Sequence, residues 1–365
     1  MLYIWMIIIS VYFSGGLNKK NAQKNRNVKY KINISKSDIK IFLSMIPPFA
    51  VSALRYGIGT DYFWTYVPLF QLLKNGGESE TFEIIFYSAV KGLVKITDNY
   101  QWLFVITSFI FCYFVFKAIY YESEKINYSV LLFYITTVFF ISMNNIRQSL
   151  ASALILYGLR FLKEDNIKKY IAVVIIASLV HQSMIVALIF IFAKKINIKK
   201  EVLLILSIFF YIFRNNIFQI LRLIIIRIPK FEKYFVFNVF TSKTIPTSII
   251  IINIMLVIIA FGIEMSNTGI SKEFYFVLFK WNQLIILTCC MLDGLVPAAY
   301  RILNIFTFLQ VILIPNTIEC IEKKKYKNYI YIIVMGIFSI YCIRAVLSGA
   351  DGIWPYHSIL ENKMS

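Results

Sequence analysis

The residues that could carry chemistry lie in a few short polar segments between long apolar stretches. Arg55 and Asp61 flank two glycines in Arg-Tyr-Gly-Ile-Gly-Thr-Asp-Tyr; glycines permit tight turns and close approach of a ligand. Arg147 follows Asn144 and Asn145 at the expected start of a helix. A cation is disfavoured there by the helix dipole, and a bound anion would offset that conflict. These arginines therefore indicate an anion-binding site.

Two further polar positions interrupt apolar sequence. His181 stands with Gln182 and Ser183 inside an apolar run, and Arg301 directly precedes another run. The simpler interpretations are a hydrogen-bonded packing histidine and arginines that extend to the membrane interface. Charges at membrane depth cost a few kcal/mol, however, and are functional candidates by default. Their convergence on one membrane face favours a ligand site.

The composition indicates that membrane-spanning helices hold these residues in place. Of 365 residues, 59% are hydrophobic and 16% are charged, with a mean hydropathy of +0.70. Soluble domains average about 45–50% apolar and about 25% charged residues. Soluble enzyme folds are excluded, and we predict an all-α polytopic integral membrane protein that forms a single transmembrane domain over residues 1–365.

Apolar stretches of about 20 residues are the signal for membrane-spanning helices. The predicted spans are residues 1–16, 39–53, 102–121, 128–143, 149–162, 170–193, 202–213, 247–265, 274–296, 302–318 and 329–347. Residues 81–96 and 217–228 have apolar positions at helical spacing, and we predict amphipathic helices at the outer interface. The expected total is about 11–12 transmembrane helices.

The net charge of +19 predicts the topology. In a soluble protein it would suggest nucleic acid, but cytoplasmic loops collect Lys and Arg, so no nucleic-acid partner is expected. The basic segment 17–40 is predicted to be cytoplasmic, which places the loop 55–101 outside. The lysines at 323–327 predict another inner loop, and counting backwards from it places the segment 214–246 outside. Residues 170–193 have basic clusters at both ends. We predict that this segment is broken or re-entrant around His181; one straight span would leave four lysines on the disfavoured side.

Metals and cofactors are not expected. The five cysteines lie in or beside apolar runs, without the paired spacing of a zinc site or a disulfide framework. No phosphate-binding loop or dinucleotide fingerprint is present in the sequence.

The polar segments together resemble the EpsG family of bacterial polysaccharide polymerases. The resemblance rests on the Arg55–Tyr62 pattern with Tyr66, on Asn145-Ile-Arg-Gln, and on His181 in its Ser178–Ser183 stretch. Arg301 and the late Pro355-Tyr356 also fit. The resemblance implies a Wzy-type polymerase, which acts on undecaprenyl-diphosphate-linked oligosaccharides at the outer face of the bacterial cytoplasmic (inner) membrane. A chain-length regulator and a flippase are the further partners it suggests beside the lipid bilayer.

The resemblance also suggests roles for individual residues. We predict that Arg147 and Arg301, with Arg55 as a further candidate, hold the departing diphosphate and stabilise its charge, and that His181 removes the proton of the acceptor hydroxyl. Asp61 is the alternative base, the residue that orients His181, or a contact to sugar hydroxyls. The predicted substrate-binding residues are Arg55, Thr60, Tyr62, Asn145, Gln148, Ser183 and Arg301.

Other membrane functions share these features. A flippase for the same lipid-linked unit would also contain many spans and buried arginines, but its charges should line a central cavity and its halves should repeat. A lipid-phosphosugar-dependent glycosyltransferase would transfer a single sugar instead. An O-acetyltransferase is disfavoured because no early acidic-histidine pair is present.

Overall fold

The computed structural model describes residues 1–17, 35–225, 227, 245–263, 270–295 and 299–362. Most of the predicted basic loop 17–40, and residues 226 and 228–244 of the predicted outer segment 214–246, lie outside the described residues. Within the described ranges the chain is helical and forms no strand, which confirms the predicted all-α class.

The chain divides into two compact units. The first comprises Met1–Leu188 and Phe338–Ser365, and the second comprises Ile189–Ile337. The sequence had predicted a single domain over residues 1–365. The division passes through one long helix, α18 (Lys324–Leu347), which begins in the second unit and ends in the first.

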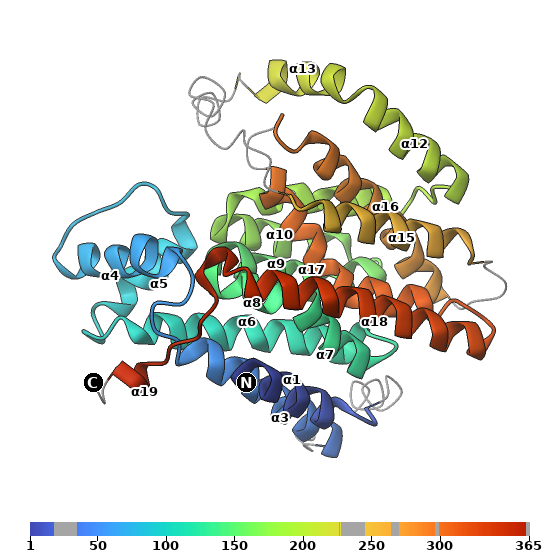
Figure 1. The fold of residues 1–365 in the computed structure, drawn as a ribbon. Coiled ribbons are helices and arrows are strands. Elements are labelled where there is room, and N and C mark those ends of the chain that lie inside the picture. The colour runs from blue at the N-terminus through green and yellow to red at the C-terminus, as the bar shows by residue number, and fades with distance from the viewer. Residues whose placement is uncertain (18–34, 226, 228–244, 264–269, 296–298, 363–365) are drawn as a thin grey trace. The chain divides into compact units, whose positions relative to one another are not determined.

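The first unit is a stack of neighbouring helices. Figure 1 shows α1 packed on α3, α3 on α6, α6 on α9 and α9 on α10. Two short helices, α4 and α5, lie side by side between α3 and α6 in the chain. The bounds are α1 Leu2–Ser14, α3 Lys36–Ala53, α4 Val67–Lys74, α5 Ile84–Leu93, α6 Gln101–Glu122, α7 Ile126–Ile135, α8 Val138–Asn144, α9 Ile146–Lys163 and α10 Ile167–Val180.

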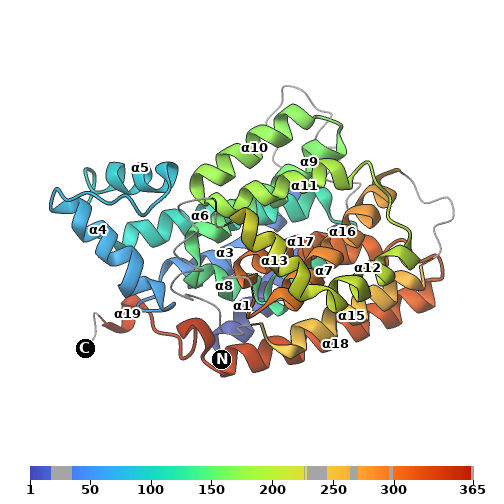
Figure 2. The ribbon, with the colours of Figure 1, turned by 90° about the horizontal axis from the view of Figure 1, so that it is seen from above.

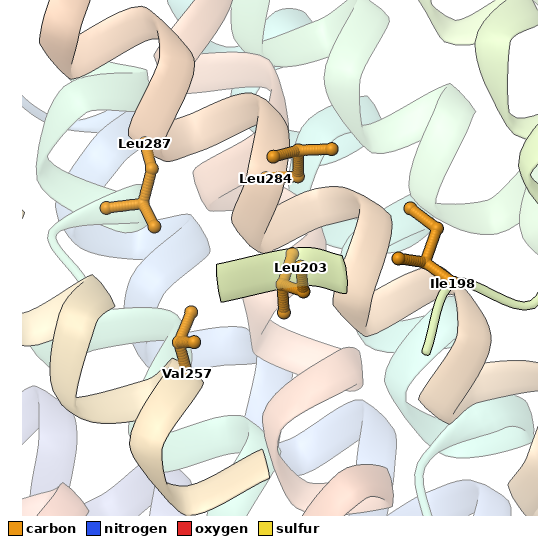
Figure 3. Close-up of a cluster of buried hydrophobic side chains, with 5 residues drawn as sticks. All are labelled: Ile198, Leu203, Val257, Leu284 and Leu287. Atoms are coloured by element: carbon orange, nitrogen blue, oxygen red, sulfur yellow. The ribbon is translucent and has the colours of Figure 1, made fainter. Parts of the chain in front are cut away.

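The second unit is built around the long helix α16. Leu203 of α12 and Val257 of α15 meet Leu284 and Leu287 of α16, and Ile198 joins them from the preceding loop (Figure 3). This apolar cluster holds the three helices together by close packing, because helices within a bilayer gain little from the exclusion of water. The bounds are α11 Ile189–Ala193, α12 Lys200–Ile212, α13 Arg214–Ile225, α15 Thr247–Phe261, α16 Ile270–Leu292 and α17 Ala299–Ile318.

The helix surfaces are those of a membrane protein. On α6 the exposed side chains include Trp102, Ile106 and Phe109, while Phe104 and Cys112 are buried. An apolar outer stripe of this size is disfavoured in water and favoured against lipid. Four of the described helices are long and apolar enough to cross a membrane, or five if the bent pair α7–α8 is one span. Other predicted spans correspond to shorter apolar helices, including α1 and α15.

The segment 170–193 is broken at His181, as predicted. Helix α10 ends at Val180, His181 is extended (φ −153°, ψ 113°), and a 3-10 helix follows over Gln182–Leu188. The hydroxyl of Tyr170, at the start of α10, donates to the carbonyl of Ala187 at 2.9 Å. The chain therefore reverses direction at His181, and the straight-span alternative is excluded.

Candidate functional site at the α8–α9 junction

Asn145 joins two helices without an intervening loop. Its N–H donates to the carbonyl of Ile141 (2.8 Å) in the last turn of α8, and its carbonyl accepts from the N–H of Ser149 (2.9 Å) in the first turn of α9. Asn144, the last residue of α8, and Arg147, in the first turn of α9, are therefore held in fixed positions on either side of this junction. Each belongs to a separate polar cluster.

The first cluster is a charged triad of Arg147, Glu83 and His181. Arg147 Nη1 lies 2.6 Å from Glu83 Oε2, and His181 Nδ1 lies 3.3 Å from Glu83 Oε1. The side chains are 21%, 12% and 13% exposed, respectively. Arg147 also lies over the ring of Phe82, 4.6 Å from its centroid. The triad thus places a cation and an imidazole around one carboxylate that solvent barely reaches.

The triad depends on the break in the 170–193 segment. Figure 2 shows α5 beside the end of α10, and the two helices are in contact. Glu83 immediately precedes α5, and the N–H of Gln182, just past the break, donates to Glu83 Oε1 at 3.3 Å. An unbroken α10 would keep the N–H of Gln182 inside the helix ladder. The extended residue His181 is what turns both groups towards Glu83.

Glu83 is ionised in this setting. Burial alone would raise its pKa, but the neighbouring His181 and the charge of Arg147 outweigh burial and lower the pKa of Glu83 to about 2. A carboxylate with so low a pKa keeps its negative charge at any physiological pH. It therefore neutralises Arg147 when no other anion is bound.

Sequence reasoning did not select Glu83. It treated this residue as part of the polar face of an amphipathic helix at 81–96, and that helix, α5, is present over Ile84–Leu93. The feature that could have singled out Glu83 is its position: a carboxylate between two apolar neighbours, Phe82 and Ile84, directly before the first residue of the helix.

The second cluster joins three distant parts of the chain: Asp61, Asn144 and Asp351. The backbone N–H of Asp61 donates to Asn144 Oδ1 (2.9 Å), and Asn144 Nδ2 donates to Asp351 Oδ1 (3.0 Å). The Thr60 hydroxyl also donates to Asn144 Oδ1, at 3.1 Å. The Asp61 carboxylate accepts from the hydroxyl of Thr65 (3.1 Å). Asn144 thus links the backbone of Asp61 to the carboxylate of Asp351, two residues that the sequence separates by almost the whole chain.

Asp351 was also missed from the sequence. It stands in a turn with a left-handed backbone (φ 59°), which is strained for a residue with a side chain. Partial burial raises the pKa of Asp351; the hydrogen bond from Asn144 opposes this, and the charge of Asp61 adds to it. Its signal was the flanking pair Gly349 and Gly352 beside a polar residue.

The glycine-containing turn after Arg55 docks on the turn at Asp351. The N–H of Gly59 donates to the carbonyl of Gly352 and that of Thr60 to the carbonyl of Asp351, both at 3.0 Å. Gly59 has φ +92°, and a Cβ there would lie 2.7 Å from the carbonyl oxygen of Met143. Only glycine fits this close approach, so the spacing of the two glycines serves to bring Asp61 to Asn144.

Substituting Gly59 with alanine is expected to lower both stability and activity. The added methyl group must push the end of α8 away, so we expect a loss of about 1–3 kcal/mol in unfolding free energy. Thermal melting of the purified protein in detergent measures it. Gly76→Ala is the matched control, since Gly76 also has positive φ (+78°) but nothing within 4 Å of its Cβ position. Equal melting temperatures for the two variants would contradict the close-packing argument.

Tyr66 is influenced by a residue of each cluster. It is fully buried, and burial raises its pKa to about 12; Arg147 opposes this shift by charge and hydrogen bonding, and Asp61 reinforces it by charge. Tyr66 is the last residue of a π-helix over Tyr62–Tyr66 that follows the glycine turn.

The other predicted residues are distributed as follows. Asn145 and Gln148 lie at the junction itself, and Gln148 is buried. Ser183 follows the break after His181, and its Oγ is buried without a hydrogen-bond partner among the described residues. Arg301 belongs to the second unit, at the start of α17, where its Nε donates to the hydroxyl of Tyr300.

Arg55 and Tyr62 point into the interior of the first unit. Arg55 is 1% exposed, and its guanidinium contacts Ser52 and Ser108 and lies 4.7 Å from the ring centroid of Phe104. Tyr62 stacks on Phe104 at 4.0 Å and donates to Gln101 Oε1 at 2.9 Å. These two side chains are not brought to the triad or to Asn144.

The chain was compared with known protein families, curated proteins and solved structures. A family model described as the EpsG family matches residues 39–358, a range that contains both clusters. The chain belongs to the EpsG family. Membership in the EpsG family supports a Wzy-like polysaccharide polymerase, that is, a glycosyltransferase-like activity, at the level of the family. No curated protein and no solved structure matches the chain.

The EpsG-family chain brings oxygen ligands and a histidine together without forming a metal cluster. Among the described residues, no group of three or more His, Cys, Asp or Glu side chains could hold a metal ion. The polar side chains at the junction offer an arginine for an anion, an imidazole for a proton, and the carboxylates of Asp61 and Asp351 in the cluster of Asn144.

Proposed function

We propose that this chain joins undecaprenyl-diphosphate-linked oligosaccharide repeat units into a capsular, exopolysaccharide or O-antigen chain. The reaction would take place at the outer face of the bacterial cytoplasmic membrane. The observation that carries the proposal is the triad: a partly exposed arginine and a histidine share one carboxylate at a break between membrane helices. This combination suits a reaction that releases a diphosphate and removes a proton.

The arginine supplies the electrostatic part of the reaction. As the bond between the anomeric carbon and the diphosphate oxygen breaks, negative charge develops on that oxygen, and Arg147 would stabilise it. Arg147 Nη1 is paired with Glu83 and its Nε has no hydrogen-bond partner among the described residues. The diphosphate would thus compete with Glu83 for a guanidinium that is already held in place.

The base that accepts the proton of the acceptor hydroxyl would be His181 or Asp61. The acceptor hydroxyl attacks the anomeric carbon and its proton passes to the base, so that one glycosidic bond forms for each phosphate ester bond broken. His181 is the candidate in the triad, and Glu83 would orient it. Asp61 is the alternative, because it is held beside Asn144 and Asp351, where sugar hydroxyls would find both donors and acceptors.

A genetic experiment with product analysis tests the proposal. In a strain that lacks this gene, we expect single lipid-linked repeat units to accumulate on the outer side of the membrane and long polymer to disappear. His181→Ala should reproduce that phenotype while the protein remains in the membrane at the normal level. Gels of lipid-linked polymer report chain length, and glycosidase or lectin access to the units in intact cells reports their side.

Other outcomes separate the alternative functions. Retention of the units on the cytoplasmic side would point to a flippase, and units that lack one sugar would point to a transferase that adds a single sugar. Normal long polymer from His181→Ala would remove His181 from the catalytic assignment and leave Asp61 as the base.

A further inference from the structure

Arg55 is a buried cation whose contacts are all with neutral groups. It is 1% exposed, and its guanidinium contacts the Ser52 carbonyl and hydroxyl, the Ser108 hydroxyl and the ring of Phe104. Among the described residues no carboxylate pairs with it. Burying an unpaired charge is costly, so a buried arginine normally has an anion beside it.

A small polar cavity lies next to Arg55. Its volume is about 10 Å³, roughly the 10–15 Å³ that one water molecule requires. It therefore has room for one particle of the size of water or a small halide ion, and none for a phosphate group. The hydroxyl residues that line it are Ser52, Thr107, Ser108, Ser142 and Ser149.

Two donors at this cavity have no partner in the protein. Arg55 Nε and Ser149 Oγ are both buried and make no hydrogen bond among the described residues; Ser149 is 1% exposed. By contrast, the hydroxyl protons of Thr107 and Ser142 are already donated to the carbonyls of Leu103 and Phe139. The cavity therefore offers an N–H and an O–H donor, beside a positive charge.

The first turn of α9 also faces the cavity. Ile146, Ser149 and Leu150 line it, and Ile146 is the first residue of that 18-residue helix. The amino end of a helix carries partial positive charge that favours an anion. The guanidinium of Arg55, the two unpartnered donors and the amino end of α9 thus all present positive charge or hydrogen-bond donors at one place.

From these observations we propose that the Arg55 cavity binds a single halide ion, chloride under physiological conditions. The ion would neutralise Arg55 and accept hydrogen bonds from Ser149 Oγ and Arg55 Nε. It would thereby connect the turn that carries Asp61 to the helix that carries Arg147. The proposal concerns a structural ion and does not depend on the polymerase assignment.

The halide site is tested by anion-dependent stability of the purified full-length protein in detergent. Melting is followed in sodium chloride, sodium bromide and sodium gluconate at equal ionic strength. We expect chloride and bromide to raise the melting temperature over gluconate in a saturable way, because the ion binds only the folded protein and gluconate is too large for the cavity. Equal melting temperatures in all three salts would overturn the proposal and mean that water occupies the cavity.

Two variants locate the effect. Ser149→Ala removes the unpartnered hydroxyl, so we expect the half-saturating chloride concentration to rise about tenfold, typical of a lost hydrogen bond to a charged group. Ser142→Ala is the matched control, since Ser142 lines the same cavity but its proton is committed to Phe139, and its chloride dependence should match the wild type. Wild-type chloride dependence in Ser149→Ala would place the halide elsewhere. Should Ser149→Ala not fold, the preference of the unaltered protein for halides over gluconate still decides the question.

Discussion

Arg147→Ala is expected to abolish long polymer and to reduce the rate of polymerisation about 10²- to 10³-fold. This is the usual loss when one preorganised group that stabilises developing negative charge is removed. Arg147→Lys should restore little activity, because an ammonium cannot hold Glu83 and a phosphate oxygen with the planar fork of a guanidinium. Single lipid-linked repeat units should accumulate, as measured on gels of lipid-linked products.

The control for this variant is Arg160→Ala in the same helix. Arg160 is near the opposite end of α9, where its Nη1 donates to the hydroxyl of Tyr157 at 2.6 Å. Its loss should leave polymer length unchanged at equal membrane levels. Long polymer from Arg147→Ala, or its loss from Arg160→Ala alone, would contradict the role of Arg147.

Glu83→Gln is expected to affect both stability and activity. The pKa of Glu83 falls from its ordinary value of 4.5 to about 2 in the folded protein. One pKa unit corresponds to about 1.4 kcal/mol, so the ionised carboxylate contributes on the order of 3 kcal/mol to folding. Because the folded-state pKa is the lower one, this contribution is complete above about pH 4.5 and is lost as the pH falls towards 2.

Melting temperatures against pH measure this contribution. The difference between the wild type and Glu83→Gln should be largest near pH 7 and should shrink steadily below pH 4.5. Glu78→Gln is the control, since Glu78 is 79% exposed in its pair with Lys91 and should give little difference at any pH. A difference between wild type and Glu83→Gln that is unchanged between pH 7 and pH 3 would contradict the buried ion pair.

The same variant should reduce polymerisation about 10- to 100-fold, which is the range seen when a carboxylate that orients a functional histidine is removed. Glu83 acts here as a positioning residue for Arg147 and His181. A stability loss without any loss of polymer at permissive temperature would restrict Glu83 to a structural role.

The sequence predicted the positions of the helices better than the contacts between them. Apolar stretches located the long helices such as α6, α16 and α18, and basic clusters at both ends of 170–193 predicted the break that the structure places at His181. Two glycines beside an arginine marked the turn at Arg55, and the structure shows this turn to be tightly packed. The short helix α4 and the π-helix before it were not predicted, because they lie in a loop whose apolar content is interrupted.

Contacts between distant segments were beyond sequence reasoning. Arg55 and Arg147 look alike in the sequence, since each is an arginine beside a polar turn. The fold buries Arg55 among serines, whereas it leaves Arg147 partly exposed in a pair with Glu83. Burial and partner depend on which helices pack together, and no local pattern reports that.

The sequence by itself determined that the chain lies in a membrane, that it is helical, and where its helices must stop. Apolar length, glycine and charge are local properties, and a membrane turns them directly into spans and breaks. Only the tertiary structure decided which polar residues meet. Glu83 joins His181 because α5 packs on α10, and Asp351 joins Asp61 because the late turn docks on Gly59 and Thr60. A charge in a poorly solvated interior must find a partner, and the packing of the helices chooses which one.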